Sequence, residues 1–115
     1  MLVGAICAAP ASASRRATGA ETRGMWRTVD PGQKCVHHRG VVSTVKSARY
    51  RYGRVTVADS NCGDGVVVLR QPRAGGRWRK VLAGSDIGSP DRCADDLKKL
   101  PTSVYRDLFP RVNCP

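Results

Sequence analysis

Four cysteines, Cys35, Cys62, Cys93 and Cys114, constrain the fold of this chain more than any other feature of its sequence. An even number of cysteines in a short chain is typical of a disulfide framework formed in an oxidising compartment. Four cysteines permit three pairings. We expect Cys35–Cys62 and Cys93–Cys114, because each pair closes a compact loop, worth about 3 kcal/mol in the chain-entropy treatment. Zinc is the competing interpretation, but no C-x-x-C or H-x-x-x-H spacing is present.

The first 13 residues predict a signal peptide or the remnant of one. Residues 2–9 form a short apolar run, and Ala11-Ser12-Ala13 matches a small-x-small cleavage pattern. The run is shorter than the roughly 20 residues that span a bilayer, so we expect no membrane span. No Lys or Arg precedes it, which leaves open an upstream start, a fragment or a chance feature of an Ala-rich terminus. Cleavage after Ala13 would remove Cys7 and leave the four paired cysteines.

The remaining chain has room for a single domain. Residues 14–24 are polar and without periodicity, and we interpret them as a flexible arm. Residues 25–115 form the expected disulfide-stabilised domain, with Trp26 as an early anchor of its core. Overall hydrophobic content is 41%, which is typical of a folded protein.

The fold class expected for this domain is α+β, with a small antiparallel sheet of three to four strands packed by a C-terminal helix. β-branched and aromatic residues predict strands in 41–52, 54–58, 66–70 and 77–83, with Gly53 as a break and a turn at 61–65. In the last strand, period-2 spacing places Trp78 and Leu82 on one face. A helical turn is expected in 91–97 and a second helix in 102–109, started by Pro101 and ended by Pro110.

The C-terminal half resembles small, uncharacterised secreted proteins of high-GC Gram-positive bacteria. The resemblance rests on Trp78-Arg79-Lys80-Val81, Gly84-Ser85, Cys93, Pro101-x-x-Val104-x-x-Asp107-Leu108 and Cys114. It covers about a third of the chain and implies secretion and the Cys93–Cys114 bond. It implies no activity.

The formal net charge is +11, from 20 Lys and Arg against 9 Asp and Glu. Such an excess favours anionic partners such as cell-wall polymers, lipid surfaces or nucleic acid. The Arg-rich, Ala-rich and Gly-rich composition is equally what a GC-rich genome would produce, so a compositional origin stays open. Our candidate anion-binding residues are basic side chains of the predicted strands and hairpin: Arg49, Arg51, Arg54, Arg70, Arg73, Arg77, Arg79 and Lys80.

Residues that could support catalysis have simpler explanations. His37 and His38 are adjacent, so on a strand they point to opposite faces and are badly placed to converge on one phosphate. Residues 59–65 lack the order of ligands in a calcium loop and indicate a turn with Asx caps around a disulfide. Asp95, Asp96 and Asp107 could form paired carboxylates, but capping and helix-dipole roles explain the acidic residues at 91–96 better. We therefore expect no catalytic residues, no cofactor and no metal.

The function expected from the sequence is a secreted, non-catalytic basic domain that binds an anionic partner at or outside the cell envelope. An anionic polymer or lipid surface fits the charge better than nucleic acid, because Tyr50 and Tyr52 are expected in the core and not on a stacking surface. A secreted enzyme inhibitor, using the 72–76 loop with Arg73 and Arg77 against a protein partner, is the alternative. A small nuclease that depends on His37 or His38 is the third hypothesis.

Overall fold

A computed structural model describes residues 14–46, 49–112 and 114 of the chain, so the expected signal segment lies outside the described residues. The fold is α+β, as predicted. Its centre is a five-stranded antiparallel sheet in which neighbours in sequence are neighbours in space. The strands are β1 (Arg15–Arg16), β2 (Val41–Val42), β3 (Tyr50–Asp59), β4 (Gly63–Pro72) and β5 (Arg79–Gly84). The strand that the sequence did not predict is β1, and the strand expected over 41–52 is divided between β2 and the start of β3.

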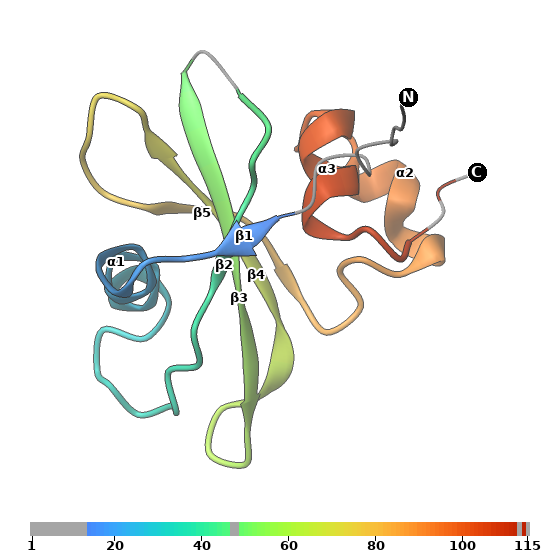
Figure 1. The fold of residues 1–115 in the computed structure, drawn as a ribbon. Helices are drawn as coiled ribbons and strands as arrows, with labels where there is room; N and C mark the ends of the chain where they lie inside the picture. The colour runs from blue at the N-terminus through green and yellow to red at the C-terminus, as the bar shows by residue number, and fades with distance from the viewer. Residues whose placement is uncertain (1–13, 47–48, 113, 115) are drawn as a thin grey trace, which may run out of the picture.

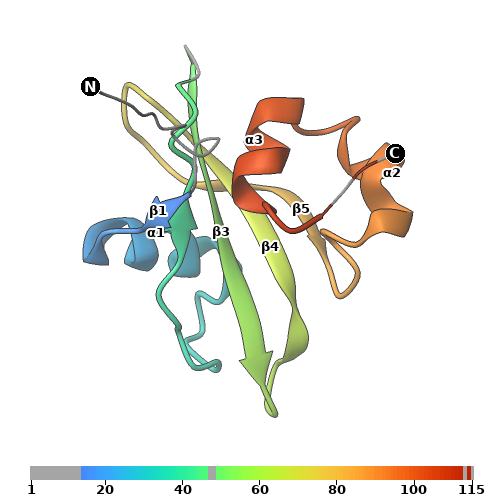
Figure 2. The same cartoon turned by 45° about the vertical axis from the view of Figure 1, so that its right-hand side comes forward.

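Helices cover both faces of the sheet. Helix α1 (Gly19–Val29) lies on one face, and η2 (Pro90–Arg92), α2 (Cys93–Asp96) and α3 (Thr102–Leu108) lie on the other. Figures 1 and 2 show α1 and the C-terminal helices on opposite sides of the strands. The sheet therefore separates two apolar cores, one under α1 and one under α3.

The interpretation of residues 14–24 as a flexible arm is wrong, because they contain β1 and the first half of α1. Thr18 caps the helix: its hydroxyl accepts from the backbone N–H of Glu21 at 3.1 Å, and the Glu21 carboxylate accepts from the Thr18 N–H at 2.8 Å. This reciprocal capping box satisfies two backbone donors that a helix N-terminus leaves free. The helix then buries Met25 and Trp26 against the sheet.

The sequence predicted that Gly53 would break a strand, and this prediction is wrong. Gly53 lies inside β3, opposite Val42. The reason is a close approach of α1. A Cβ atom on Gly53 would lie 2.8 Å from the sulfur of Met25 and 2.9 Å from the carbonyl oxygen of Val41. Gly40 meets Met25 in the same way, at 2.7 Å. The two glycines thus form a socket for the fully buried Met25 side chain.

A β-bulge separates Trp78 and Leu82, which were expected on one face. Val68 pairs with Leu82 but Leu69 pairs with Lys80, so Val81 is the extra residue on β5. An extra residue reverses the side-chain alternation beyond it. Trp78 accordingly packs in the core under α1, and Leu82 packs in the core under α3.

Both predicted disulfides are present. Cys35–Cys62 joins the segment after α1 to the β3–β4 turn, and Cys93–Cys114 joins α2 to the chain beyond α3. The β3–β4 turn carries the expected Asx cap, with the Asp59 carboxylate accepting from the N–H groups of Asn61 and Val36. These two hydrogen bonds hold the pKa of Asp59 below its ordinary value.

The predicted C-terminal helix is confirmed as α3, and it buries two unexpected polar groups beneath the helical layer. Asp96 is fully buried and is not a cap: it accepts from the Tyr105 hydroxyl at 3.0 Å. Burial first, and then this hydrogen bond, raise the pKa of Tyr105 to about 12. Asp107, also buried, accepts from the Ser43 hydroxyl and the Thr44 N–H, both at 2.6 Å. The two carboxylates thus bind different partners and do not form a catalytic pair.

The socket for Met25 yields a stability prediction. We expect Gly53→Ala to lower the free energy of unfolding by about 1–3 kcal/mol, the usual cost of overpacking a core, because the Val41 carbonyl cannot give way freely. Urea denaturation of the intact disulfide-bonded protein measures this. Gly32→Ala is the matched control: its Cβ would meet only the Lys34 side chain, at 3.6 Å, so a change within about 0.5 kcal/mol is expected. Equal effects of the two substitutions would contradict the close packing of α1.

Candidate anion-binding surface

The predicted basic residues gather mostly at one end of the sheet, where β3 begins and the β4–β5 hairpin turns. Arg70 pairs with Arg79 across β4 and β5, and the Arg73 N–H donates to the Arg49 carbonyl at 2.9 Å. Arg49, Arg73, Arg77, Arg79 and Lys80 are exposed. The exposed basic side chains are therefore carried by segments that meet at one end of the sheet.

Other groups of the protein engage Arg51, Arg54 and Arg70, which belong to the predicted set. Arg54 lies half-buried under α3, with its guanidinium 5.4 Å from the centroid of the Phe109 ring, and burial lowers its pKa. Arg70 stacks over Tyr50 at 4.2 Å on the same face. Arg51 points to the opposite face, where it lies 3.9 Å from the Glu21 carboxylate. The eight predicted residues are thus divided between both faces and do not form one patch.

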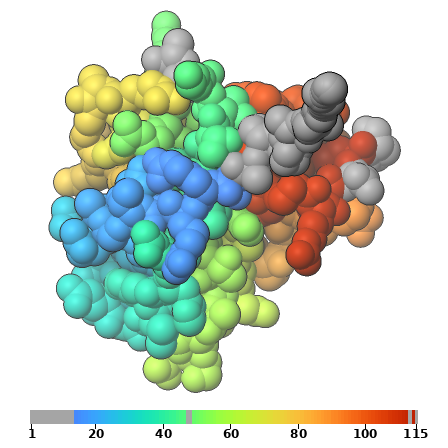
Figure 3. All heavy atoms as spheres, in the orientation of Figure 1, coloured from blue at the N-terminus to red at the C-terminus, as the bar shows by residue number. Residues whose placement is uncertain are grey.

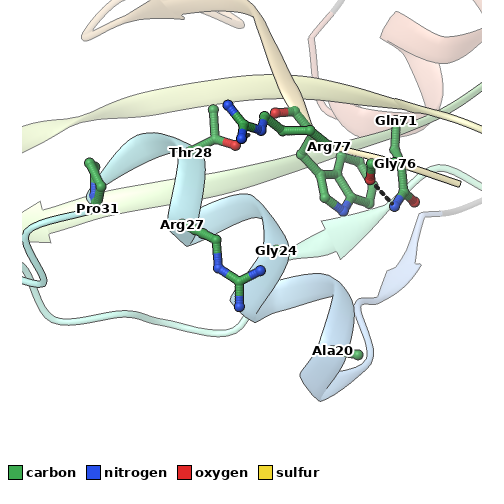
Figure 4. A pocket seen from close by; sticks show the side chains of 9 residues that line it. Ala20, Gly24, Arg27, Thr28, Pro31, Gln71, Gly76 and Arg77 are labelled. Carbon is green, nitrogen blue, oxygen red and sulfur yellow. Dashed lines mark hydrogen bonds between the residues drawn. The ribbon is translucent and has the colours of Figure 1, made fainter.

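A groove of about 800 Å³ lies between α1 and the β4–β5 hairpin (Figure 4). Arg27 stands on the helix side and Arg77 on the hairpin side, and the buried Trp78, which is 3% exposed, also lines the groove. Of the described residues that line the groove, none is Asp or Glu. An anion in this groove would meet two guanidinium groups without a neighbouring carboxylate to repel it.

The walls of the groove are fixed by contacts within the protein. The Thr28 hydroxyl donates to the Trp78 carbonyl at 2.7 Å, which ties α1 to the start of β5. The Gln71 amide donates to the Gly76 carbonyl at 2.8 Å, a contact drawn in Figure 4, and holds the hairpin loop. A Cβ on Gly24 would lie only 2.8 Å from Trp78, so the helix touches the indole directly. The backbone of both walls is therefore held in place, which reduces the entropy that the walls lose on binding.

Two smaller hollows flank α1 on its other side, next to the segment 31–39. Each has a volume of about 280 Å³, and both are lined by Arg23, Trp26 and His37. Arg27 lines the nearer one and Arg39 the farther one. In Figure 3 the surface over α1, in blue, lies between the yellow hairpin and the teal segment that follows the helix.

Arg23, Arg27 and Arg39 were missed by the sequence analysis. Arg23 and Arg27 were hidden by the assumption that the chain up to residue 24 is a flexible arm. The signal that could have found them is the Thr18-x-x-Glu21 capping pattern followed by basic residues four apart, which share one helix face. Arg39 has no comparable signal, because its position beside α1 depends on a hydrogen bond from its Nε to the Ala17 carbonyl.

His37 is held in place by two neighbouring side chains. Its ring stacks on Trp26 with centroids 4.4 Å apart and planes 6° apart, and its Nε2 lies 2.7 Å from the Asp30 carboxylate. Asp30 also accepts from the N–H groups of Lys34 and Cys35. The Cys35 hydrogen bond, followed by that of His37, lowers the pKa of Asp30. His38 contributes its carbonyl to the Trp26 indole N–H at 2.8 Å.

The described residues contain no group of three or more His, Cys, Asp or Glu side chains placed to hold a metal ion. No helix within residues 14–46 and 49–112 is long and apolar enough to cross a membrane. Comparison of the chain with protein-family models, with curated proteins and with solved structures gives no match. The surface described above is therefore the basis for any assignment of function.

Glu21 links the stability of α1, and so of the groove, to pH. Its pKa is lowered to about 2, chiefly by the hydrogen bonds from Arg15, at 2.9 Å, and also by those from Thr18. A depressed folded-state pKa means that Glu21 stabilises the fold above its ordinary pKa of 4.5, and that this contribution is lost as pH falls towards 2. Glu21→Gln lacks this carboxylate at every pH.

We therefore expect the free energies of unfolding of the native protein and Glu21→Gln to differ most above pH 5 and to converge as pH falls to about 2. Urea denaturation at a series of pH values measures the difference. A gap between the two proteins that is constant with pH would contradict the role given to the carboxylate.

Proposed function

We propose that this protein is a secreted, non-catalytic domain that binds an anionic partner through the groove between α1 and the β4–β5 hairpin. The observation that carries the proposal is the pair Arg27 and Arg77 on the two sides of a preorganised groove whose described lining contains no carboxylate. Two guanidinium groups in a concave site attract an anion more strongly than scattered surface charges do.

Secretion is supported by the chemistry of the cysteines. Two intramolecular disulfides are typical of an oxidising, extracellular type of compartment. The resemblance of the C-terminal half to small secreted proteins of high-GC Gram-positive bacteria points the same way. The anionic partner would then be met at or outside the cell envelope.

The contacts of the titratable side chains within the protein favour a binding role over catalysis. His37 is occupied by Trp26 and Asp30, and the carboxylates of Asp96 and Asp107 are buried and bonded to separate partners. Neither histidine lines the groove between Arg27 and Arg77. A nuclease would need a general acid and base that face one phosphate.

The binding proposal is tested with the disulfide-bonded protein and a teichoic-type polymer, by titration calorimetry at several salt concentrations. We expect the double variant Arg27→Gln/Arg77→Gln to bind at least 10-fold more weakly than the native protein, with a shallower dependence on salt. Lys99→Gln/Arg106→Gln is the matched control, because it removes the same charge from exposed positions on the other helical layer.

Equal weakening by the two double variants would mean that net charge alone drives association and that the groove is not the site. Absence of salt-sensitive binding to the teichoic-type polymer, heparin and nucleic acid alike would overturn the proposed function.

Secretion is tested by the intact mass of the protein recovered from the culture medium of its native host, with thiol labelling before and after reduction. We expect a form that starts near Ser14 and takes up four labels only after reduction. A full-length form found inside the cell with free thiols would contradict secretion.

A further inference from the structure

We propose that the anionic partner is a linear phosphodiester polymer without aromatic bases, which crosses α1 from the groove to the hollow lined by Arg23 and Arg39. This inference rests on the proposed function and adds the class of ligand and its path over the surface. Its polymer class corresponds to a polyol phosphate of the teichoic type.

The path is defined by hollows that share basic residues. Arg27 lines both the groove and the nearer hollow on the other side of α1, and Arg23 lines that hollow and the farther one. Arg77 stands at one end of this series and Arg39 at the other. The basic residues thus form a continuous track, ordered Arg77, Arg27, Arg23 and Arg39, that runs over the exposed face of the helix.

The spacing within the track suits a chain of charges better than one small anion. Arg23 and Arg27 are four residues apart on α1, so their Cβ atoms are about 5–6 Å apart on one face. A single phosphate can engage the groove but cannot reach both flanks of the helix. A flexible polymer with regularly spaced phosphates can engage each guanidinium group in turn.

The carboxylate that lines the track is held by contacts within the protein. Asp30 is the one carboxylate among the described residues that line the groove and the two smaller hollows, and it lines only the nearer hollow. It accepts hydrogen bonds from the Lys34 and Cys35 N–H groups and contacts His37. Glu21 is likewise engaged by Arg15. These contacts leave the exposed Arg23 and Arg27 side chains facing solvent.

The burial of the indoles argues against nucleic acid as the polymer. Single-strand binders place aromatic side chains where bases can stack on them. Here Trp26 is 1% exposed and Trp78 is 3% exposed, and the face of Trp26 is covered by His37. The track therefore offers no exposed indole on which a base could stack, and the other aromatic ring along it among the described residues is the imidazole of His37, one face of which is already covered by Trp26. A polymer whose repeat carries phosphate but no base has no stacking energy to lose on such a surface.

The experiment compares three ligands on the disulfide-bonded protein: a poly(glycerol phosphate) of at least ten repeats, glycerol 3-phosphate, and a single-stranded oligonucleotide of equal charge. Three proteins are titrated with each ligand: the native protein, Arg23→Gln and Lys99→Gln. We expect Arg23→Gln to weaken polymer binding about five-fold, the usual effect of one basic side chain near a polyanionic surface, and to leave glycerol 3-phosphate binding unchanged. Lys99→Gln should change neither, and the oligonucleotide should bind more weakly than the polymer.

The outcomes separate the two proposals. If Arg27→Gln/Arg77→Gln abolishes polymer binding but Arg23→Gln has no more effect than Lys99→Gln, the groove is the site and the track over α1 is wrong. If the oligonucleotide binds as tightly as the polymer, the assignment of the polymer class is wrong. If none of the three ligands binds the native protein, the inference of a phosphodiester polymer as the partner is wrong. The wider proposed function is then wrong only if heparin is also not bound.

Discussion

The approach of α1 to the sheet is the contact on which the surface of this protein depends. Met25 fits a socket made by Gly40 and Gly53, and Gly24 lets the helix touch Trp78. Larger residues at these glycines would push the helix outwards, because a Cβ at each would come within 3 Å of a neighbouring atom. The positions of Arg23 and Arg27, and the width of the groove beside Arg77, follow from this contact.

The predictable parts of the fold are those determined by local chemistry. The disulfide pairing followed from loop length, the β3–β4 turn from its Asn, Gly and Asp residues, and α3 from Pro101 and the spacing of Val104 and Leu108. Helix α1 was missed because only a few of its residues are apolar, so it has little hydrophobic periodicity and depends on tertiary burial of Met25 and Trp26.

The unpredicted features arise from backbone geometry that leaves no mark in the residue pattern. The bulge at Val81 sends Trp78 and Leu82 to opposite faces, although their spacing alone places them together. The candidate site was predicted only in part, again because some of its residues are positioned by tertiary contacts that leave no pattern in the sequence. Arg77 belongs to a recognisable hairpin loop, whereas Arg39 is brought beside α1 by a hydrogen bond to the distant Ala17 carbonyl.

Each side of the sheet has its own core and its own covalent link. Cys35 packs at the edge of the core under α1, and Cys93 is part of the core under α3. The strands separate the two cores, so a fluctuation that lifts one helical layer need not disturb the apolar packing of the other. Such a division lets the residues exposed on α1 vary in an evolving lineage while the stability contributed by the C-terminal layer is preserved.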